Sequence, residues 1–305
     1  MTAVGGLLGA ALLIVATPAP GALGADRGGS TGPPSSPIVT RILELTDRSR
    51  LARPRHGKPR PRTLVTILRY PSGPASGPFP LIVFAHGFAD TPATYYRLLR
   101  SWAQAGFVVA APVFPLENAD APGGPDESDL INEPGDISFV ISRLLAESAA
   151  ASGPLAGLID PSRIAVAGHS DGAEAALAVA DARRFRDPRV RAAVILSGAE
   201  LSGIGGYDFG PGSPALLAVQ GTADTSNQPR YTYTYFRAAN RPKYLLRLPG
   251  AEHVPPYTSE QPQLGIVERV SAAFLDGYLG VAPADAERLP ALGDVPGDAE
   301  LLARP

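Results

Sequence analysis

The chain has 305 residues, with 27 lysines and arginines, 29 aspartates and glutamates, a net charge of -2 at pH 7 and no cysteine. This near-neutral balance predicts no broad basic surface for nucleic acid or an anionic membrane, so specificity is expected to lie in a local site. The lack of cysteine excludes disulfides and a lipid-modified N-terminal cysteine.

The N-terminal 25 residues carry no charged side chain and contain an apolar stretch from Gly5 to Ala16. A stretch of about 12 residues is too short to span a bilayer and is typical of a signal-peptide core, although the usual basic segment is missing. We predict a secreted protein without a stable membrane anchor, with residues 1–25 as signal peptide, Ala25 as the candidate cleavage point and 26–36 as a flexible linker. The alternative is a disordered apolar N-terminus.

Beyond residue 36, apolar runs rich in Val, Ile and Leu alternate with helix-like stretches. Such runs indicate strands buried on both faces, and their alternation with helices indicates a mostly parallel sheet covered on both sides. No repeat or boundary is visible, so we expect one α/β domain over 37–280 and a C-terminal tail over 281–305. The predicted strands are 38–45, 63–70, 80–86, 106–112, 163–168, 191–197, 215–220 and 243–249, and the predicted helices are 94–105, 136–150, 170–182, 228–239 and 263–279.

Two charged segments interrupt this pattern. Residues 115–136 contain seven acidic residues and no basic one. They follow a predicted parallel strand and so lie at the sheet edge where ligands usually bind. We interpret them as a solvated surface loop, with a substrate-contacting role as the alternative. The basic run from Arg48 to Arg62 lacks amphipathic spacing, and we interpret it as a solvated hairpin loop that includes a solvated His56.

A serine stands between two glycines in "RIAVAGHSDGAEAALAVADA", at the junction of a predicted strand and a predicted helix. This context gives the G-x-S-x-G pattern its meaning, because a sharp turn there exposes the serine hydroxyl. Gly168 and Gly172 would let the strand and the helix approach each other. Ser170 is therefore the candidate nucleophile, and the alternative is a glycine-rich turn with an N-capping serine.

A serine nucleophile needs a base, and the base needs a third group that fixes its tautomer. His253 follows the last predicted strand, where the base is expected. Asp224 follows the strand before it and fits the chain order Ser, Asp, His better than Glu200 or Asp208, which follow an earlier strand. The four histidines of the chain show no metal-ligand spacing, so no metal is predicted.

The tetrahedral intermediate of acyl transfer also needs hydrogen-bond donors for its oxyanion. The backbone N–H groups of Asp171 and Phe88 are the candidates, the latter in "FAHGFAD" after the third predicted strand. Gly87, the Phe88 ring, His169 and Val254 are the tentative pocket residues, with a structural role as the alternative for His169. The direction of the Asp171 side chain is left open.

The motifs "HGF", "GHSDG", "GTADT" and "GAEHVPP" resemble the α/β-hydrolase superfamily. Within it the chain is similar to secreted bacterial esterases related to dienelactone hydrolases, platelet-activating-factor acetylhydrolases and cutinase-like polyesterases. The resemblance runs from about Ile38 to Leu279. It implies an α/β-hydrolase fold with a mostly parallel eight-stranded sheet flanked by helices on both faces. It also implies the nucleophile, acid, base and oxyanion donors assigned above, and ester hydrolysis without a cofactor.

The sequence departs from cutinase-like polyesterases at three places. Asp171 stands where those enzymes commonly have a methionine, "SGAEL" at 197–201 stands where they have a tryptophan, and no C-terminal disulfide can form. We therefore expect a monomeric serine esterase that acts on small soluble esters, with no nucleic-acid partner. The alternatives are a polyester or cutin hydrolase or lipase, a prolyl-oligopeptidase-like peptidase, and a non-catalytic binding module with this fold.

Overall fold

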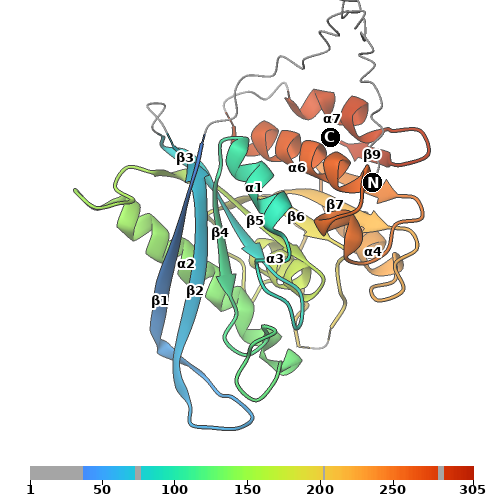
Figure 1. Cartoon of the computed structure of the whole chain (residues 1–305). Coiled ribbons are helices and arrows are strands. Elements are labelled where there is room, and N and C mark those ends of the chain that lie inside the picture. The colour runs from blue at the N-terminus through green and yellow to red at the C-terminus, as the bar shows by residue number, and fades with distance from the viewer. Residues whose placement is uncertain (1–36, 73–76, 202, 281–284) are drawn as a thin grey trace, which may run out of the picture. The chain divides into compact units, whose positions relative to one another are not determined.

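The computed structural model describes residues 37–72, 77–201, 203–280 and 285–305 (Figure 1). The predicted signal peptide and linker, 1–25 and 26–36, lie outside these residues, so secretion stays a prediction. Within the described ranges, no helix combines the length and the apolar character that crossing a membrane requires.

A nine-stranded sheet in the order β1-β2-β4-β3-β5-β6-β7-β8-β9 forms the centre of the fold. The six strands from β4 to β8 in this order are parallel to one another, whereas β2 and β9 flank them antiparallel and β1 pairs antiparallel with β2. This is an α/β-hydrolase fold, as predicted. The strands are β1 (Ile38–Ala52), β2 (Arg60–Pro71), β3 (Phe79–Ala85), β4 (Val108–Val113), β5 (Ile159–His169), β6 (Val190–Leu196), β7 (Ala215–Gly221), β8 (Lys243–Leu248) and β9 (Glu300–Arg304).

Successive side chains along the buried strands point to opposite faces of the sheet and pack into two separate hydrophobic cores. In β3, Leu81 and Val83 pack into the core beneath α2, α3 and α4, whereas Ile82 and Phe84 pack into the core beneath α1, α5, α6 and α7 (Figure 1). The sheet is thus covered on both faces. The helices are α1 (Tyr96–Gln104), the 3-10 helix η1 (Glu127–Asn132), α2 (Glu133–Ser148), α3 (Asp171–Asp181), α4 (Arg230–Ala238), α5 (Pro255–Thr258), α6 (Gln263–Leu279) and α7 (Asp285–Gly293).

The segment 281–305 is not a tail outside the domain, because its described part forms α7 and β9. Strand β9 pairs with β8 from Lys243 opposite Arg304 to Arg247 opposite Glu300. The sheet therefore has nine strands and not eight, and the described residues from 37 onwards form one compact unit. A five-residue edge strand whose pairing partner lies far away in the sequence has too weak a local pattern to be predicted.

The basic hairpin and the acidic loop are joined by an ion-pair network. Arg62, near the start of β2, is fully buried. Its guanidinium donates to both carboxylate oxygens of Asp129 (2.9 and 2.8 Å) and of Asp136 (2.8 and 2.6 Å). Arg50 of β1 binds Asp136 at 2.7 Å and Asp47 at 2.7 Å. The solvated interpretation of 115–136 is therefore wrong, because five of its seven acidic side chains are buried: Glu117, Asp126, Asp129, Glu133 and Asp136. The segment from Arg48 to Arg62 is mostly exposed, as expected, but Arg62 at its end is buried.

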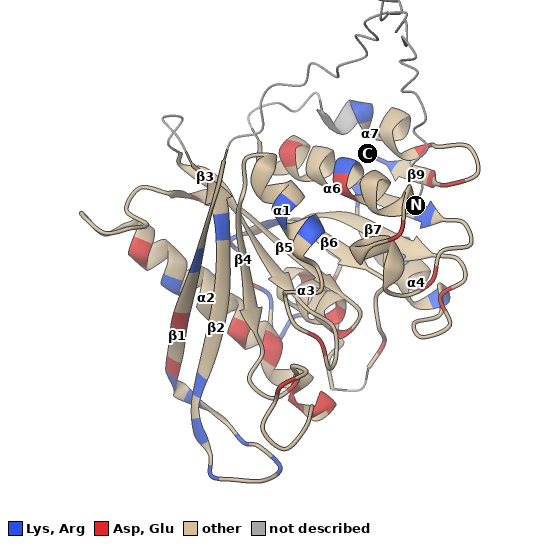
Figure 2. Cartoon of the chain, in the orientation of Figure 1, with Lys and Arg blue, Asp and Glu red and all other residues tan. Residues whose placement is uncertain are grey.

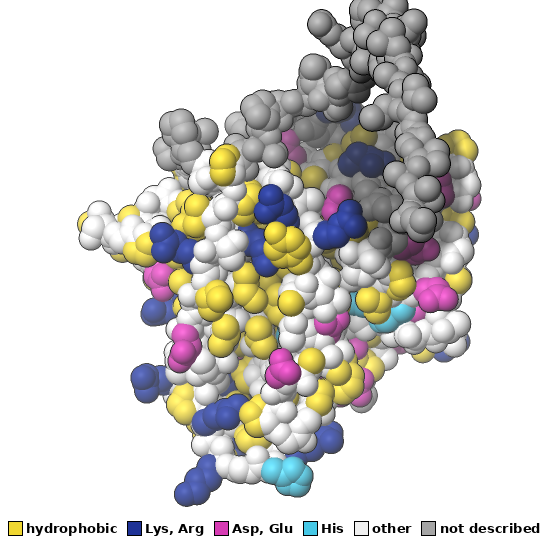
Figure 3. All heavy atoms as spheres, in the orientation of Figure 1, with side chains coloured by type: hydrophobic (Ala, Val, Ile, Leu, Met, Phe, Trp, Pro, Cys, Tyr) yellow, Lys and Arg dark blue, Asp and Glu magenta, His cyan; other side chains and the backbone are white. Residues whose placement is uncertain are grey.

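The same network is visible along the hairpin. Figure 2 shows basic residues towards the turn of the β1–β2 hairpin and acidic residues on η1 and the start of α2 beside it. Arg55 of the hairpin binds Asp126 at 3.0 Å, whereas His56 is exposed as expected. Charged side chains of both signs and apolar side chains are interspersed on the face drawn in Figure 3. The network fixes the loop after β4 against the sheet, next to the site described below.

Candidate active site

The turn between β5 and α3 holds Ser170 in a backbone conformation that few residues adopt, with φ 56° and ψ -123°. A Cβ atom on Gly168 would lie 2.0 Å from the carbonyl oxygen of Gly172, and one on Gly172 would lie 2.3 Å from the carbonyl oxygen of Ala85. Neither glycine can therefore carry a side chain in this packing. The Ser170 side chain does not cap α3, so the alternative of an N-capping serine does not fit the structure.

Three loops at the carboxyl edge of the sheet bring the predicted nucleophile, base and acid together. The Nε2 atom of His253, after β8, lies 3.1 Å from the Ser170 Oγ atom. Its Nδ1 atom lies 2.8 Å from Oδ2 of Asp224, after β7. The alternative acids lie outside this chain of hydrogen bonds, since Glu200 is exposed and Asp208 pairs with Arg183. The arrangement can transfer a proton from Ser170 to His253.

Polar groups around Asp224 keep its carboxylate ionised. Burial alone raises the pKa of Asp224, but the hydrogen bond and charge of His253 and the N–H of Asn227 outweigh it, so the pKa lies below its usual value. Oδ1 of Asp224 accepts hydrogen bonds from the backbone N–H groups of Ser226 and Asn227. Oδ2 also accepts a hydrogen bond from Nε2 of the buried Gln220 at 3.1 Å. An ionised Asp224 fixes the proton of His253 on Nδ1 and leaves Nε2 free to accept.

Sequence reasoning missed Asn227 and Gln220. The Asn227 side-chain amide donates to Ser170 Oγ (3.2 Å) and to the carbonyl of Ser197 (2.9 Å), so it positions the serine hydroxyl. The available signal was the short polar turn "ADTSN", in which an amide three residues after the acid can return to the site. Gln220 lies inside an apolar strand, and no pattern marked it.

The two predicted oxyanion donors come from different segments, Asp171 from the start of α3 and Phe88 from the loop after β3. Asp171 is the first residue of α3, so its N–H has no partner within the helix, and the N–H of Phe88 donates to no acceptor among the described residues. The loop of Phe88 is close to the nucleophile, because a Cβ atom on Gly87 would lie 3.2 Å from the Ser170 Cβ atom. His86 anchors this loop by donating from Nδ1 to the Gly87 carbonyl at 2.9 Å.

His169 does not line a pocket, contrary to its tentative assignment, because only 2% of it is exposed. Its Nε2 atom lies 3.0 Å from the carbonyl oxygen of His253 and must therefore carry the proton. Its Nδ1 atom then accepts the Tyr95 hydroxyl at 2.8 Å. Burial lowers the pKa of His169 to about 3, so the ring stays neutral. His169 thus positions the backbone of His253.

The other tentative pocket residues differ in exposure. The Phe88 side chain is 41% exposed, which fits a wall open to substrate. Val254 is half-buried and precedes α5, where its carbonyl accepts the N–H of Tyr257 at 3.1 Å. Gly87 is buried beneath the site. Phe88 and Val254 are therefore the two that a substrate could contact.

Three buried carboxyl groups lie in a row beside the nucleophile, and sequence reasoning missed two of them. Asp171 interacts with the side chains of Ser170 and Glu117, and Glu117 interacts in turn with Glu133. Glu117 and Glu133 are fully buried. Apart from the other members of the row, their carboxyl oxygens have no hydrogen-bond partner among the described residues. Burial is the largest cause that raises the pKa of Asp171 to about 6 and that of Glu117 to about 8.

This row makes the stability of the protein depend on pH. The pKa of Glu117 lies at about 8 instead of 4.5, with Glu133, Asp171 and Asp129 as the carboxyl groups around it. The folded state therefore holds a proton that the unfolded chain loses, so this contribution is complete below about pH 4.5 and disappears as the pH rises towards 8. In urea unfolding, we expect Glu117→Gln to flatten this decline by roughly 1–3 kcal/mol between about pH 5 and 8. Parallel pH profiles for the two proteins would contradict the assignment.

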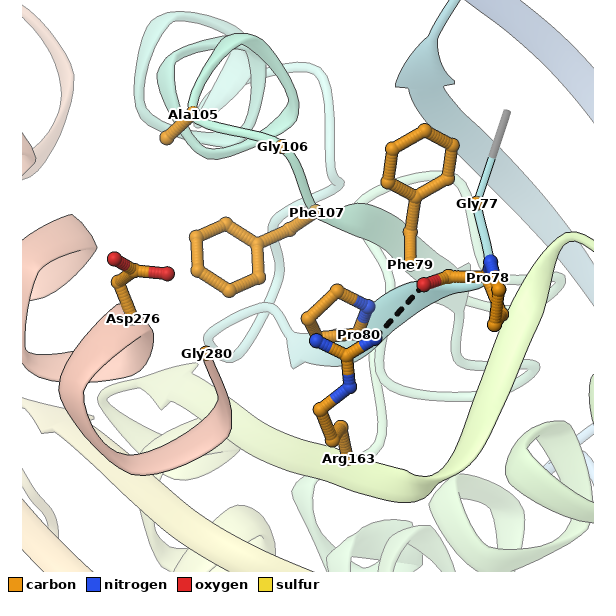
Figure 4. A pocket seen from close by; sticks show the side chains of 10 residues that line it. All are labelled: Gly77, Pro78, Phe79, Pro80, Ala105, Gly106, Phe107, Arg163, Asp276 and Gly280. Carbon is orange, nitrogen blue, oxygen red and sulfur yellow. Dashed lines mark hydrogen bonds between the residues drawn. The ribbon is translucent and has the colours of Figure 1, made fainter. Parts of the chain in front are cut away.

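Two cavities differ in their relation to the site. One of about 530 Å³ lies between η1 and the loop after β6, at the carboxyl edge, and Leu130, Ile131 and Leu201 contribute to its wall. The other, of about 330 Å³, lies at the amino ends of β3 and β5 (Figure 4), where Arg163 donates to the carbonyl of Pro78 at 2.8 Å. The second cavity is at the opposite edge of the sheet from Ser170. Across the described ranges, no group of His, Asp and Glu side chains could hold a metal ion.

A family model described as Chlorophyllase matches residues 46–194 of the chain. The match begins within β1 and ends within β6, so it includes the turn with Ser170 but neither Asp224 nor His253. No curated protein matches the chain. Together with the fold, the match to this family of α/β-hydrolase-like esterases supports a hydrolase of the α/β-hydrolase superfamily. The finer resemblance to dienelactone hydrolases, acetylhydrolases and cutinase-like enzymes stays a prediction.

Proposed function

We propose that this hydrolase cleaves carboxylic esters through an acyl-enzyme intermediate on Ser170. The observation that carries the proposal is the continuous chain of hydrogen bonds from Asp224 through His253 to Ser170, at 2.8 and 3.1 Å. A base within hydrogen-bond reach of a serine, itself oriented by an ionised acid, is the arrangement that nucleophilic acyl transfer requires.

In the first half of the reaction, Nε2 of His253 accepts the Ser170 proton while Oγ attacks the ester carbonyl carbon. The negative charge that develops on the carbonyl oxygen is held by the backbone N–H groups of Phe88 and Asp171. Asp224 stabilises the resulting imidazolium through Nδ1. The C–O bond then breaks, and the leaving alkoxide takes the proton from His253.

In the second half, water enters the position of the alcohol. His253 removes one proton from the water, the hydroxide attacks the acyl carbon, and Ser170 leaves with that proton as the acid product is released. His253 therefore acts first as base and then as acid in each half, and no cofactor takes part in the proposed steps. Asn227 keeps Oγ aimed at the substrate by its hydrogen bond at 3.2 Å.

We propose small soluble esters as the substrates. Supporting this class, the residue after the nucleophile is an aspartate, whereas cutinase-like enzymes commonly have a methionine there. The cavity of about 530 Å³ is also of a size for a small acyl or alcohol group. The alternative functions are a polyesterase, a prolyl peptidase and a non-catalytic binding module. The experiment distinguishes them by turnover of a polyester, by turnover of a prolyl amide, or by no turnover.

The proposed intermediate predicts covalent labelling. A fluorophosphonate probe is expected to modify Ser170 stoichiometrically, and mixing with p-nitrophenyl butyrate is expected to release p-nitrophenolate in a burst whenever deacylation is the slower half. Peptide mass spectrometry identifies the labelled residue, and stopped-flow absorbance measures the burst.

The same preparation distinguishes the alternatives. Faster turnover of a prolyl p-nitroanilide than of the butyrate ester would favour a peptidase, and release of soluble products from a polyester film at a comparable rate would favour a polyesterase. Failure of the probe to label folded protein would favour a non-catalytic binding module and contradict the proposal.

A further inference from the structure

A cavity of about 420 Å³ lies where the C-terminal end of α4 meets β8 and β9. Basic side chains form much of its wall, and the other residues that line it are uncharged. The basic residues are Arg237, Arg241, Lys243 and Arg304. Lys243 is the first residue of β8, whereas Ser170 follows the end of the parallel strand β5. The cavity therefore lies at the opposite edge of the sheet from the proposed active site.

The pairing of β8 with β9 places two of these cations directly opposite each other. Lys243 faces Arg304 in the register of the two strands. At the other end of the same ladder, Arg247 faces Glu300 and binds it at 2.7 Å. Like charges on directly opposed residues of an antiparallel pair destabilise a sheet, whereas opposite charges stabilise it. A bound anion would relieve the repulsion at the cavity end of the ladder.

The end of α4 holds the ammonium group of Lys243 at the cavity. Its Nζ atom donates to the carbonyl oxygens of Arg237 at 2.9 Å and Ala239 at 2.6 Å. The same atom lies 5.3 Å from the centre of the Phe236 ring. An ammonium group has three N–H donors, so one of them stays available for a ligand.

These four cations have no counter-ion among the residues that the structure describes. Arg237 donates to the hydroxyl of Thr234 at 2.9 Å, and Arg304 donates to a backbone carbonyl at 2.8 Å, so both acceptors are neutral. Burial and the charges of Arg241 and Arg304 lower the pKa of Lys243, as expected for cations that repel one another. The positive charge around the cavity is therefore uncompensated.

We propose that this cavity binds a small phosphorylated ligand. Guanidinium groups donate paired hydrogen bonds that match phosphate oxygens, and an ammonium group adds a compact positive charge. A volume of about 420 Å³ is of the size that holds a small molecule. The inference is independent of the proposed ester hydrolysis, because none of the residues that line the cavity takes part in that reaction.

Isothermal titration calorimetry of the full chain with diphosphate tests the site. At low ionic strength we expect one site per chain and a dissociation constant below about 1 mM. Arg304→Gln and Arg241→Gln should each weaken binding by about 5- to 30-fold, because each removes charge-assisted hydrogen bonds to the phosphate oxygens. Arg247→Gln is the matched control, since it makes the same change of charge on β8 outside the cavity, and it should keep the affinity within about 2-fold.

Thermal unfolding gives a second readout, with the opposite sign. Without ligand, Arg304→Gln should raise the Tm by about 1–3 °C, because it removes one of two facing cations, whereas Arg247→Gln should not raise it. Saturating diphosphate should then raise the Tm of the parent protein by more than that of Arg304→Gln. Differential scanning calorimetry measures both effects and shows that each variant is folded.

Several outcomes would overturn the proposal. The cavity would not be the site if diphosphate did not bind, if both glutamine variants in the cavity bound it as tightly as the parent, or if Arg247→Gln lost as much affinity as they do. Equal affinity for citrate would overturn the assignment to phosphate, since citrate is a small multivalent anion without phosphoryl oxygens. Binding to vesicles of phosphatidylcholine and phosphatidic acid, without binding to free diphosphate, would overturn the assignment to a small ligand.

Discussion

Replacing Ser170 by alanine is expected to lower kcat for p-nitrophenyl butyrate by on the order of 10⁴- to 10⁶-fold, because no other group can form the acyl-enzyme. The fold should be retained. The serine side chain caps no helix, and alanine removes only the hydroxyl group and its contacts with His253 and Asn227. Steady-state kinetics with active-site titration measure the loss, and circular dichroism checks the fold.

The variant His253→Ala tests whether Ser170 and His253 act together. A nucleophile and its base act as a unit, so the double variant with Ser170→Ala should be no slower than either single variant. Exposed residues of the same types serve as controls, and Ser259→Ala and His56→Ala should stay within about 2-fold of the parent protein, since surface substitutions rarely perturb a distant site. A Ser170→Ala protein that retains more than a hundredth of the parent kcat would contradict the proposed mechanism.

The sequence predicted the centre of this site because its signals are local. The G-x-S-x-G pattern requires a tight approach of β5, α3 and the loop after β3, and the distances of 2.0 and 2.3 Å at Gly168 and Gly172 express that requirement directly. Chain order then selected Asp224 and His253. The structure brings all three side chains together.

Residues that act on the site through long-range contacts could not be predicted. Glu117 and Glu133 belong to an acidic loop whose composition is typical of solvated surface. Only the fold shows that this loop is buried against a hairpin more than 60 residues upstream. His169 was open to two interpretations for the same reason. A histidine beside the nucleophile can face substrate or core, and the Tyr95 hydroxyl that fixes it is 74 residues away.

The fold was predictable where a strand contains a run of apolar residues, as β3 to β8 do. At the two ends of the sheet the signals are weaker. The β1–β2 hairpin extends beyond the predicted strands because buried ion pairs, and not apolar side chains, stabilise its distal part. Strand β9 depends on pairing with β8. The local sequence therefore predicts the central strands of the sheet, whereas the lengths and positions of its edge strands depend on tertiary contacts.

The ion-pair network at the hairpin leads to the largest effect on stability that we expect. Substituting methionine for Arg62 removes the cation shared by Asp129 and Asp136, both of which remain buried. Removing one partner of a buried ion pair costs about 3–5 kcal/mol, because the remaining charge is left without its partner. Asp136 keeps Arg50, so the penalty falls mainly on Asp129, and the expected loss is near the lower limit. Urea unfolding at neutral pH measures it.

Two further variants decide whether this loss comes from uncompensated charge. In Arg247→Met the ion pair with the exposed Glu300 is lost, and the free energy of unfolding should change by less than about 1 kcal/mol. Adding Asp129→Leu and Asp136→Leu to Arg62→Met removes the stranded carboxylates and should recover at least half of the lost stability, since apolar replacements of buried ion pairs are often neutral. If the triple variant were less stable than Arg62→Met alone, the network would stabilise the hairpin by its geometry, and the charge argument would fail.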